Sequence, residues 1–214
     1  MRPKILSLRM VWQRWIRTVE VAPGLDAGGA AVISGQVEAL LRTGARIVHV
    51  DVGDEFTGSA AALSTLVPLV HRYEGVVDLH VTAGNPMLLF GAAAGAGADS
   101  VTFAADAVDD VGAAIQAARD TGVQVGVALA DDALAQQVQD ADLVLAPCDA
   151  ALVRRLRMAL PSTCEISVEG PEVDAPGALP PLYEAGARVF VVREAIFSRE
   201  DLPRAWRRLV QDLA

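Results

Sequence analysis

The chain has 214 residues, which suits one domain with a complete hydrophobic core. It is 52% hydrophobic but only 5% aromatic, so the core consists mainly of small aliphatic side chains, as in parallel strands covered on both faces. The net charge is −9, and residues 1–17 hold five basic and no acidic residues, so the remainder is more acidic still. Nucleic acid and anionic membranes are therefore poor partners.

The pattern of apolar residues predicts neither export nor membrane insertion. Residues 1–17 lack the continuous apolar stretch and cleavage site of a secretory signal. We expect them to form an extra helix that covers the barrel bottom or a subunit interface, with a membrane-surface helix as the alternative. The run 87–98 is shorter than the ~18 residues that a membrane span needs. Cys148 and Cys164 are expected to be packed thiols in a reducing compartment.

Short runs rich in Val and Ile alternate with longer helical patterns, with a period of about 25 residues. This alternation predicts βαβ units and a parallel sheet. An open flavodoxin-like sheet would use about five strands, so eight units favour a single (β/α)8 TIM barrel over residues 18–214. The predicted strands are 18–22, 46–52, 76–81, 100–104, 123–129, 142–146, 163–169 and 188–192, and the predicted helices lie near 29–43, 60–72, 85–96, 108–121, 131–138, 149–159, 176–185 and 200–213.

Polar residues at the ends of these strands indicate the site, because active sites of such barrels lie at the carboxyl ends of the strands. The second strand places His49 and Asp51 on one face, and the third strand does the same with Asp78 and His80. The seventh strand ends at Glu169. Two imidazoles and two carboxylates at one mouth predict a divalent metal site for Zn, Fe, Mn or Co.

The alternative is that each of these side chains is a satisfied polar residue in a layer of the barrel. One histidine alone would favour that interpretation. His49, Asp51 and His80 together, at the exits of adjacent strands, favour the metal site. His71 ends a predicted helix and is expected only to interact with its dipole.

Six segments, in order from about residue 19 to the C-terminus, are VAPGLDAG, GARIVHVDVGDEF, VVDLHVTAGNP, GVALADDALA, EISVEGPEV and VVREAIF. They resemble the ribulose-phosphate 3-epimerase family, with HVDV and the later D-x-H-x-x-x-x-N-P as the most specific parts. The resemblance implies a cytoplasmic homo-oligomer of carbohydrate metabolism with one divalent metal, held by two His and two Asp. It also implies interconversion of D-ribulose 5-phosphate and D-xylulose 5-phosphate.

By this resemblance His49, Asp51 and His80 stand at metal-ligand positions, and Glu169 stands where the family has its second Asp. Asp51 and Glu169 are then the paired acid and base. One removes the proton α to the carbonyl, the metal stabilises the enediolate, and the other protonates the opposite face. The extra methylene of Glu169 shifts its oxygens by about 1.5 Å from those of an Asp.

The loops that hold the substrate phosphate in the family differ here. The second glycine after strand seven is replaced by proline, and the Gly-Ser after strand eight is replaced by Arg193 and Glu194. Glu194 would repel a dianion. Gly170 and Arg193 are the expected substrate-binding residues, and Arg193 would hold a phosphate or carboxylate. The alternative is an ion pair of Arg193 with Glu169, Glu172 or Glu194.

These features favour a metal-dependent epimerase or isomerase that acts on a ketose, its phosphate or a related hydroxy-carbonyl compound, with altered phosphate recognition. A lyase using the same enediolate chemistry is one alternative. An inactive barrel that keeps its metal and binds a partner protein is the other. We favour the enzyme with a small carbohydrate substrate, because an inactive protein has little reason to retain a metal-ligand set.

Overall fold

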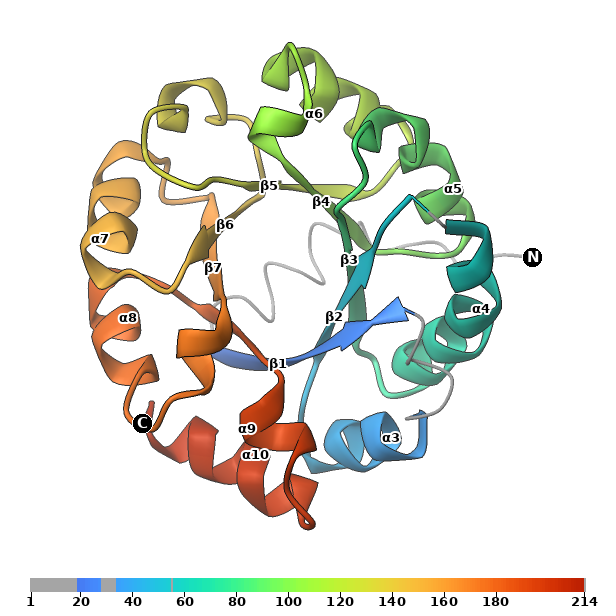
Figure 1. Cartoon of the computed structure of the whole chain (residues 1–214), viewed down its shortest axis with the longest axis vertical. Helices are drawn as coiled ribbons and strands as arrows, with labels where there is room; N and C mark the ends of the chain where they lie inside the picture. The colour runs from blue at the N-terminus through green and yellow to red at the C-terminus, as the bar shows by residue number, and fades with distance from the viewer. Residues whose placement is uncertain (1–18, 28–33, 55, 214) are drawn as a thin grey trace.

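The computed structural model describes residues 19–27, 34–54 and 56–213, so the predicted extension at 1–17 lies outside the described residues. Eight parallel strands close into a barrel in chain order, with the first strand hydrogen-bonded to the eighth (Figure 1). The predicted (β/α)8 TIM barrel is thereby confirmed. The strands are β1 (Glu20–Asp26), β2 (Ile47–Val52), β3 (Val76–Val81), β4 (Ser100–Ala104), β5 (Gln124–Ala128), β6 (Leu143–Pro147), β7 (Glu165–Glu169) and β8 (Val189–Val192).

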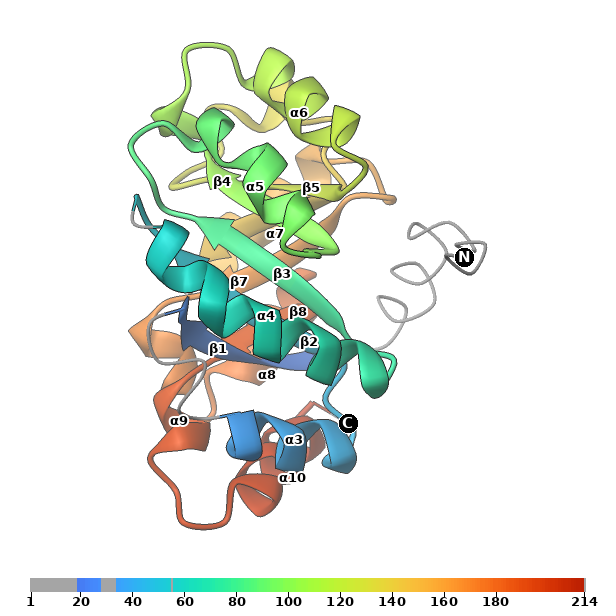
Figure 2. The same cartoon turned by 90° about the vertical axis from the view of Figure 1, so that its right-hand side faces the viewer.

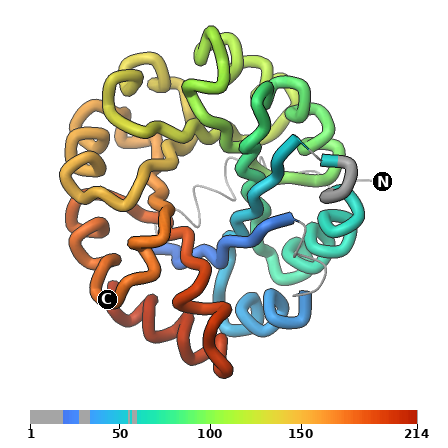
Figure 3. The backbone as a smooth tube through the Cα atoms, in the orientation of Figure 1, coloured from blue at the N-terminus to red at the C-terminus, as the bar shows by residue number. Residues whose placement is uncertain are grey.

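Helices form a ring around the strands, as the tube in Figure 3 shows. The arrowheads of β1 and β3 point toward the same end of the barrel in the side view of Figure 2. Among the described residues, no helix is long and apolar enough to cross a membrane. The helices are α3 (Ser34–Thr43), α4 (Phe56–Arg72), α5 (Phe90–Gly95), α6 (Val111–Asp120), α7 (Ala150–Ala159), α8 (Leu179–Ala185), α9 (Glu194–Phe197) and α10 (Leu202–Gln211), and the 3-10 helices are η1 (Pro86–Leu88), η2 (Ala105–Ala107), η3 (Ala135–Gln137) and η4 (Pro171–Asp174).

Several predicted elements differ in extent, and the helix expected near 85–96 is divided into η1 and α5. The helix expected near 131–138 is only the short η3, because the Asp131 side chain accepts a hydrogen bond from the Ala133 backbone N–H and so competes with helical bonding. Strand β1 continues past residue 22, and its residues from Gly24 onward pair with β2. This extension carries β1 up to the mouth of the barrel.

Along β2 and β3, the inward-facing side chains change from apolar to polar. Near the amino ends of the strands, four buried side chains form a small cluster: Ala22, Ile47, Val76 and Val189. Because side chains alternate between the two faces of a strand, the next inward positions of β2 and β3 after Ile47 and Val76 are His49 and Asp78. Both are buried. His49 and Asp78 thus lie directly above this apolar cluster.

His71 joins the end of α4 to the start of β4. Its Nε2 lies 2.8 Å from Oδ2 of Asp99, and the same oxygen accepts a hydrogen bond from the Val77 backbone N–H at 2.7 Å. The hydrogen bond to Asp99 raises the pKa of His71. The partner of His71 is therefore a specific carboxylate, beyond the helix dipole expected from the sequence.

We expect His71→Gln to destabilise the protein more at pH about 5 than at pH about 9, on either side of the ordinary histidine pKa of about 6.5. A group with a raised folded-state pKa contributes its full stability below the unfolded pKa and loses it as the pH rises through the folded pKa. Urea unfolding of both proteins at the two pH values measures the difference. An equal loss of unfolding free energy at both would contradict this account of the pair.

Candidate metal centre and active site

The structure brings four predicted site residues together at the mouth of the barrel. His49 and Asp51 come from β2, His80 from β3 and Glu169 from β7, and their ligand-type atoms all lie within 4.8 Å of one another. Parallel pairing of β2 and β3 sets Asp51 opposite His80. Nδ1 of His80 lies 3.2 Å from Oδ1 of Asp51 and 3.5 Å from Oε1 of Glu169. Strand register alone therefore builds half of this cluster.

The Nε2 atom of His49 is the feature that best fits a metal. It is buried and makes no hydrogen bond, although it lies 3.3 Å from Oδ1 of Asp51 and 3.4 Å from Oε2 of Glu169. Buried polar atoms without a hydrogen-bond partner are rare in folded proteins. Imidazole nitrogens with carboxylate oxygens are the donor set of zinc and related transition metals. His49, Asp51, His80 and Glu169 thus fit one divalent ion.

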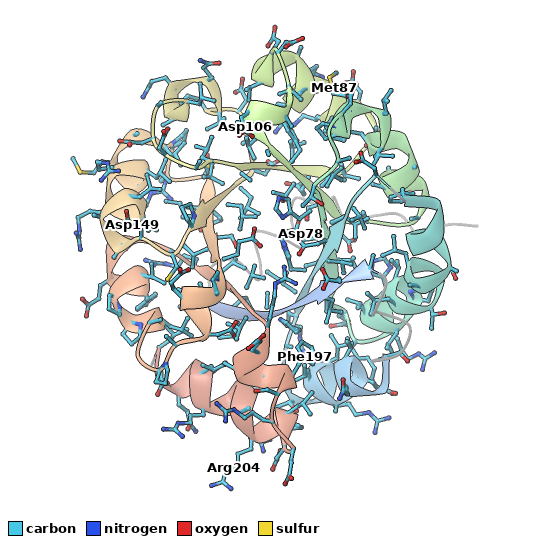
Figure 4. All side chains as sticks on the ribbon, in the orientation of Figure 1. Asp78, Met87, Asp106, Asp149, Phe197 and Arg204 are labelled. Atoms are coloured by element: carbon cyan, nitrogen blue, oxygen red, sulfur yellow. The ribbon has the colours of Figure 1, made fainter. Side chains whose placement is uncertain are left out.

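Asp78 orients His49. Its Oδ2 lies 2.8 Å from Nδ1 of His49, while its Oδ1 accepts hydrogen bonds from Ser100 Oγ at 2.5 Å and Thr102 Oγ1 at 3.0 Å. Figure 4 shows Asp78 toward the middle of the barrel. Gly126 leaves room for this network, because a Cβ there would clash with Oγ1 of Thr102. With Nδ1 engaged by Asp78, His49 presents Nε2 to the cluster.

Burial and hydrogen bonding oppose each other in the pKa values of the cluster. Burial acts to lower the pKa of His49, but its interactions with the nearby carboxylates of Asp51, Asp78 and Glu169 prevail and raise it well above its ordinary value. Burial acts to raise the pKa of Asp51 and of Glu169, but bonds with the histidines prevail and lower both. The carboxylates are therefore ionised at neutral pH, which prepares them to bind a cation.

Arg193 extends from the end of β8 into this cluster. Its Nη2 atom lies 2.5 Å from Oδ2 of Asp51 and 3.8 Å from Oε2 of Glu169. The Arg193 side chain packs over Gly24 of β1, where a larger residue would not fit, since a Cβ there would lie 3.0 Å from Cγ and 3.2 Å from Cζ of Arg193. The predicted ion pair with a glutamate is present with Glu169, but the shorter contact is with Asp51, which the sequence did not indicate.

Asp174, in η4, is a residue that the sequence analysis missed. Its Oδ1 accepts hydrogen bonds from the backbone N–H groups of Arg193 at 3.0 Å and Ala195 at 2.9 Å. These hydrogen bonds hold the loop after β7 against the loop after β8. No local spacing indicates this contact, because it depends on how two separate loops fold against each other.

Two cavities adjoin the cluster and share Glu169 and Gly170. The smaller, of about 390 Å³, lies between the loops after β7 and β8 and is lined by Glu169, Gly170, Pro171, Asp174, Arg193 and Glu194. The larger, of about 790 Å³, extends past His80 and Asp106 toward β5 and β6. The predicted substrate-binding residues Gly170 and Arg193 therefore both line the smaller cavity beside Glu169.

Comparison with known proteins matches residues 20–154 to the model of the ribulose-phosphate 3 epimerase family. The ribulose-phosphate 3-epimerase of Rhodospirillum rubrum is 32% identical over 135 residues, and this alignment spans only 60% of either protein. That of Bacillus subtilis (strain 168) is 26% identical over 211 residues, covering 87% of this chain and 96% of the relative.

Among solved structures, the orotidine monophosphate decarboxylase of Leishmania donovani superposes with a TM-score of 0.73 at 14% identity, covering 97% of each chain. This likeness shows the fold alone. The family match contains His49, Asp51 and His80 and ends before Glu169 and Arg193. Since it covers more than half of the sequence, the chain belongs to the ribulose-phosphate 3-epimerase family.

Proposed function

We propose that this protein is a metal-dependent epimerase or isomerase that acts on a ketose or related hydroxy-carbonyl compound, with altered recognition of phosphate. The buried Nε2 of His49, which makes no hydrogen bond within the four-residue cluster, is the observation that carries the proposal. His49, Asp51, His80 and Glu169 would hold one divalent ion, such as Zn, Fe, Mn or Co. The homo-oligomeric state and cytoplasmic location predicted from the sequence belong to the same proposal.

The carboxylates of Asp51 and Glu169 would move the proton. A bound divalent ion would supply positive charge that stabilises negative charge developing on the substrate oxygens. Asp51 is held by Arg193 at 2.5 Å, which favours its ionised form, whereas Glu169 is 3.8 Å from the same guanidinium and is freer to change protonation. The two residues lie on β2 and β7, so one can remove a proton and the other deliver one at the carbon between them.

One observation favours the second candidate, an inactive barrel that binds a partner. The guanidinium of Arg193 occupies an oxygen of Asp51 that a metal ligand or a base would need. An intact set of four donor residues, with an imidazole nitrogen that makes no hydrogen bond, weighs against it, because such a set has no evident structural use. We therefore favour the enzyme.

Purified protein should bind about one divalent ion per chain, as expected for a site with four protein ligands. His49→Ala and His80→Ala should each abolish binding, whereas His71→Ala should keep it, because His71 pairs with Asp99 away from the cluster. Elemental analysis and the thermal shift on adding zinc or manganese measure this. A folded wild-type protein with no bound ion and no shift would overturn the metal site.

Glu169→Gln should lower solvent-deuterium incorporation into a ketose substrate by about 100-fold or more, since Gln cannot carry a proton at neutral pH. Much of the metal should remain bound, because Gln keeps one oxygen donor. Glu172→Gln, on the same loop, is the matched control and should exchange like the wild type. NMR of pentuloses in deuterated water, with and without a 5-phosphate, provides the readout.

Higher activity in Glu169→Asp would identify the extra methylene as the cause of a weak rate. Unchanged exchange in both Glu169→Gln and Glu169→Asp would remove Glu169 from the chemistry and contradict the two-carboxylate mechanism.

A further inference from the structure

The loops after β7 and β8 are where barrels of this architecture commonly bind a substrate phosphate, through backbone N–H groups. In this protein two such groups, those of Arg193 and Ala195, already donate to one oxygen of Asp174, at 3.0 Å and 2.9 Å. One carboxylate oxygen of the chain therefore already engages two backbone N–H groups of the loop after β8. The N–H groups are not available for a second anion.

We propose that the Asp174 carboxylate replaces the substrate phosphate, so that this site accepts a non-phosphorylated polyhydroxy carbonyl compound. The proposal rests on the proposed function for the identity of the site as an epimerase or isomerase centre. It goes further in assigning the class of substrate.

The charges of the adjoining cavity agree with this assignment. Three carboxylates, those of Glu169, Asp174 and Glu194, line the cavity of about 390 Å³, with Arg193 as the sole cation among its lining residues. A phosphate dianion placed there would be repelled by all three. Pro171 also removes one backbone N–H from the loop.

Arg193 does not offset this repulsion. Its guanidinium already forms ion pairs within the cluster, at 2.5 Å from Asp51 and 3.8 Å from Glu169. Gly24 provides the space in which the side chain lies, since a Cβ there would contact both Cγ and Cζ of Arg193. A phosphate could recruit the guanidinium only by breaking its ion pair with Asp51.

A neutral sugar, by contrast, finds suitable partners in this cavity. Ionised carboxylates are hydrogen-bond acceptors, and sugar hydroxyl groups are donors to them. Glu194 and the second oxygen of Asp174 supply such acceptors at the cavity wall. A volume of about 390 Å³ is within the range of small-molecule sites.

The test measures binding of inorganic phosphate and sulfate to the full chain by calorimetry at constant ionic strength. The wild type should show no saturable binding, and Asp174→Ala should gain saturable binding. Asp106→Ala is the matched control: it removes one negative charge from the neighbouring cavity but frees neither N–H group, and should stay without binding. Saturable phosphate binding by the wild type would overturn the proposal, as would no gain in a folded Asp174→Ala.

A second measurement needs no variant. The wild type should turn over an unphosphorylated pentulose with a kcat/KM at least about tenfold above that of its 5-phosphate, corresponding to roughly 1.4 kcal/mol. A preference for the phosphorylated sugar would overturn the proposal. Turnover of neither sugar would contradict the proposed function, while the anion-binding result would still decide whether Asp174 fills the phosphate position.

Discussion

The hydrogen bond between Asp78 and His49 is the interaction on which the candidate site depends. It lies inside the barrel, where Asp78 is buried and receives hydrogen bonds from Ser100 and Thr102 as well. A buried carboxylate is tolerated only with such partners, and removing one from a buried charge pair costs about 3–5 kcal/mol. The same bond fixes which nitrogen of His49 faces the mouth, so the requirement to satisfy a buried charge also positions the proposed metal ligand.

The two halves of the mouth differ in whether the family model matches them. The strands that carry His49, Asp51 and His80 lie within the residues that match the family. The loops after β7 and β8 lie outside that match. There the backbone N–H of Arg193 donates to the carboxylate of Asp174, and the guanidinium of Arg193 donates to Asp51. Three of the four candidate metal ligands thus lie within the family match, while Glu169 and the loops in which we propose that Asp174 replaces a phosphate lie outside it.

Much of this arrangement is encoded locally. Alternation within IVHVDV and VVDLHV predicts that His49 and Asp51 share a face and that His80 lies beside them, and strand register then brings them together. The path of Arg193 over Gly24 and the capture of two N–H groups by Asp174 could not be predicted in this way. Both depend on contacts between segments far apart in the chain. The full length of β1 was also missed, because Pro and Gly in VAPGLD ordinarily weaken a strand.

The most direct test of the central claim is a crystal structure of the metal-loaded protein with anomalous scattering measured at the absorption edge of the metal. We predict one strong peak at the barrel mouth, bonded to Nε2 of His49, to His80 and to carboxylate oxygens of Asp51 and Glu169, at about 2.0–2.2 Å. Arg193 should have moved away from at least one oxygen of Asp51. A peak elsewhere, or none with the Arg193–Asp51 ion pair intact, would contradict the metal centre.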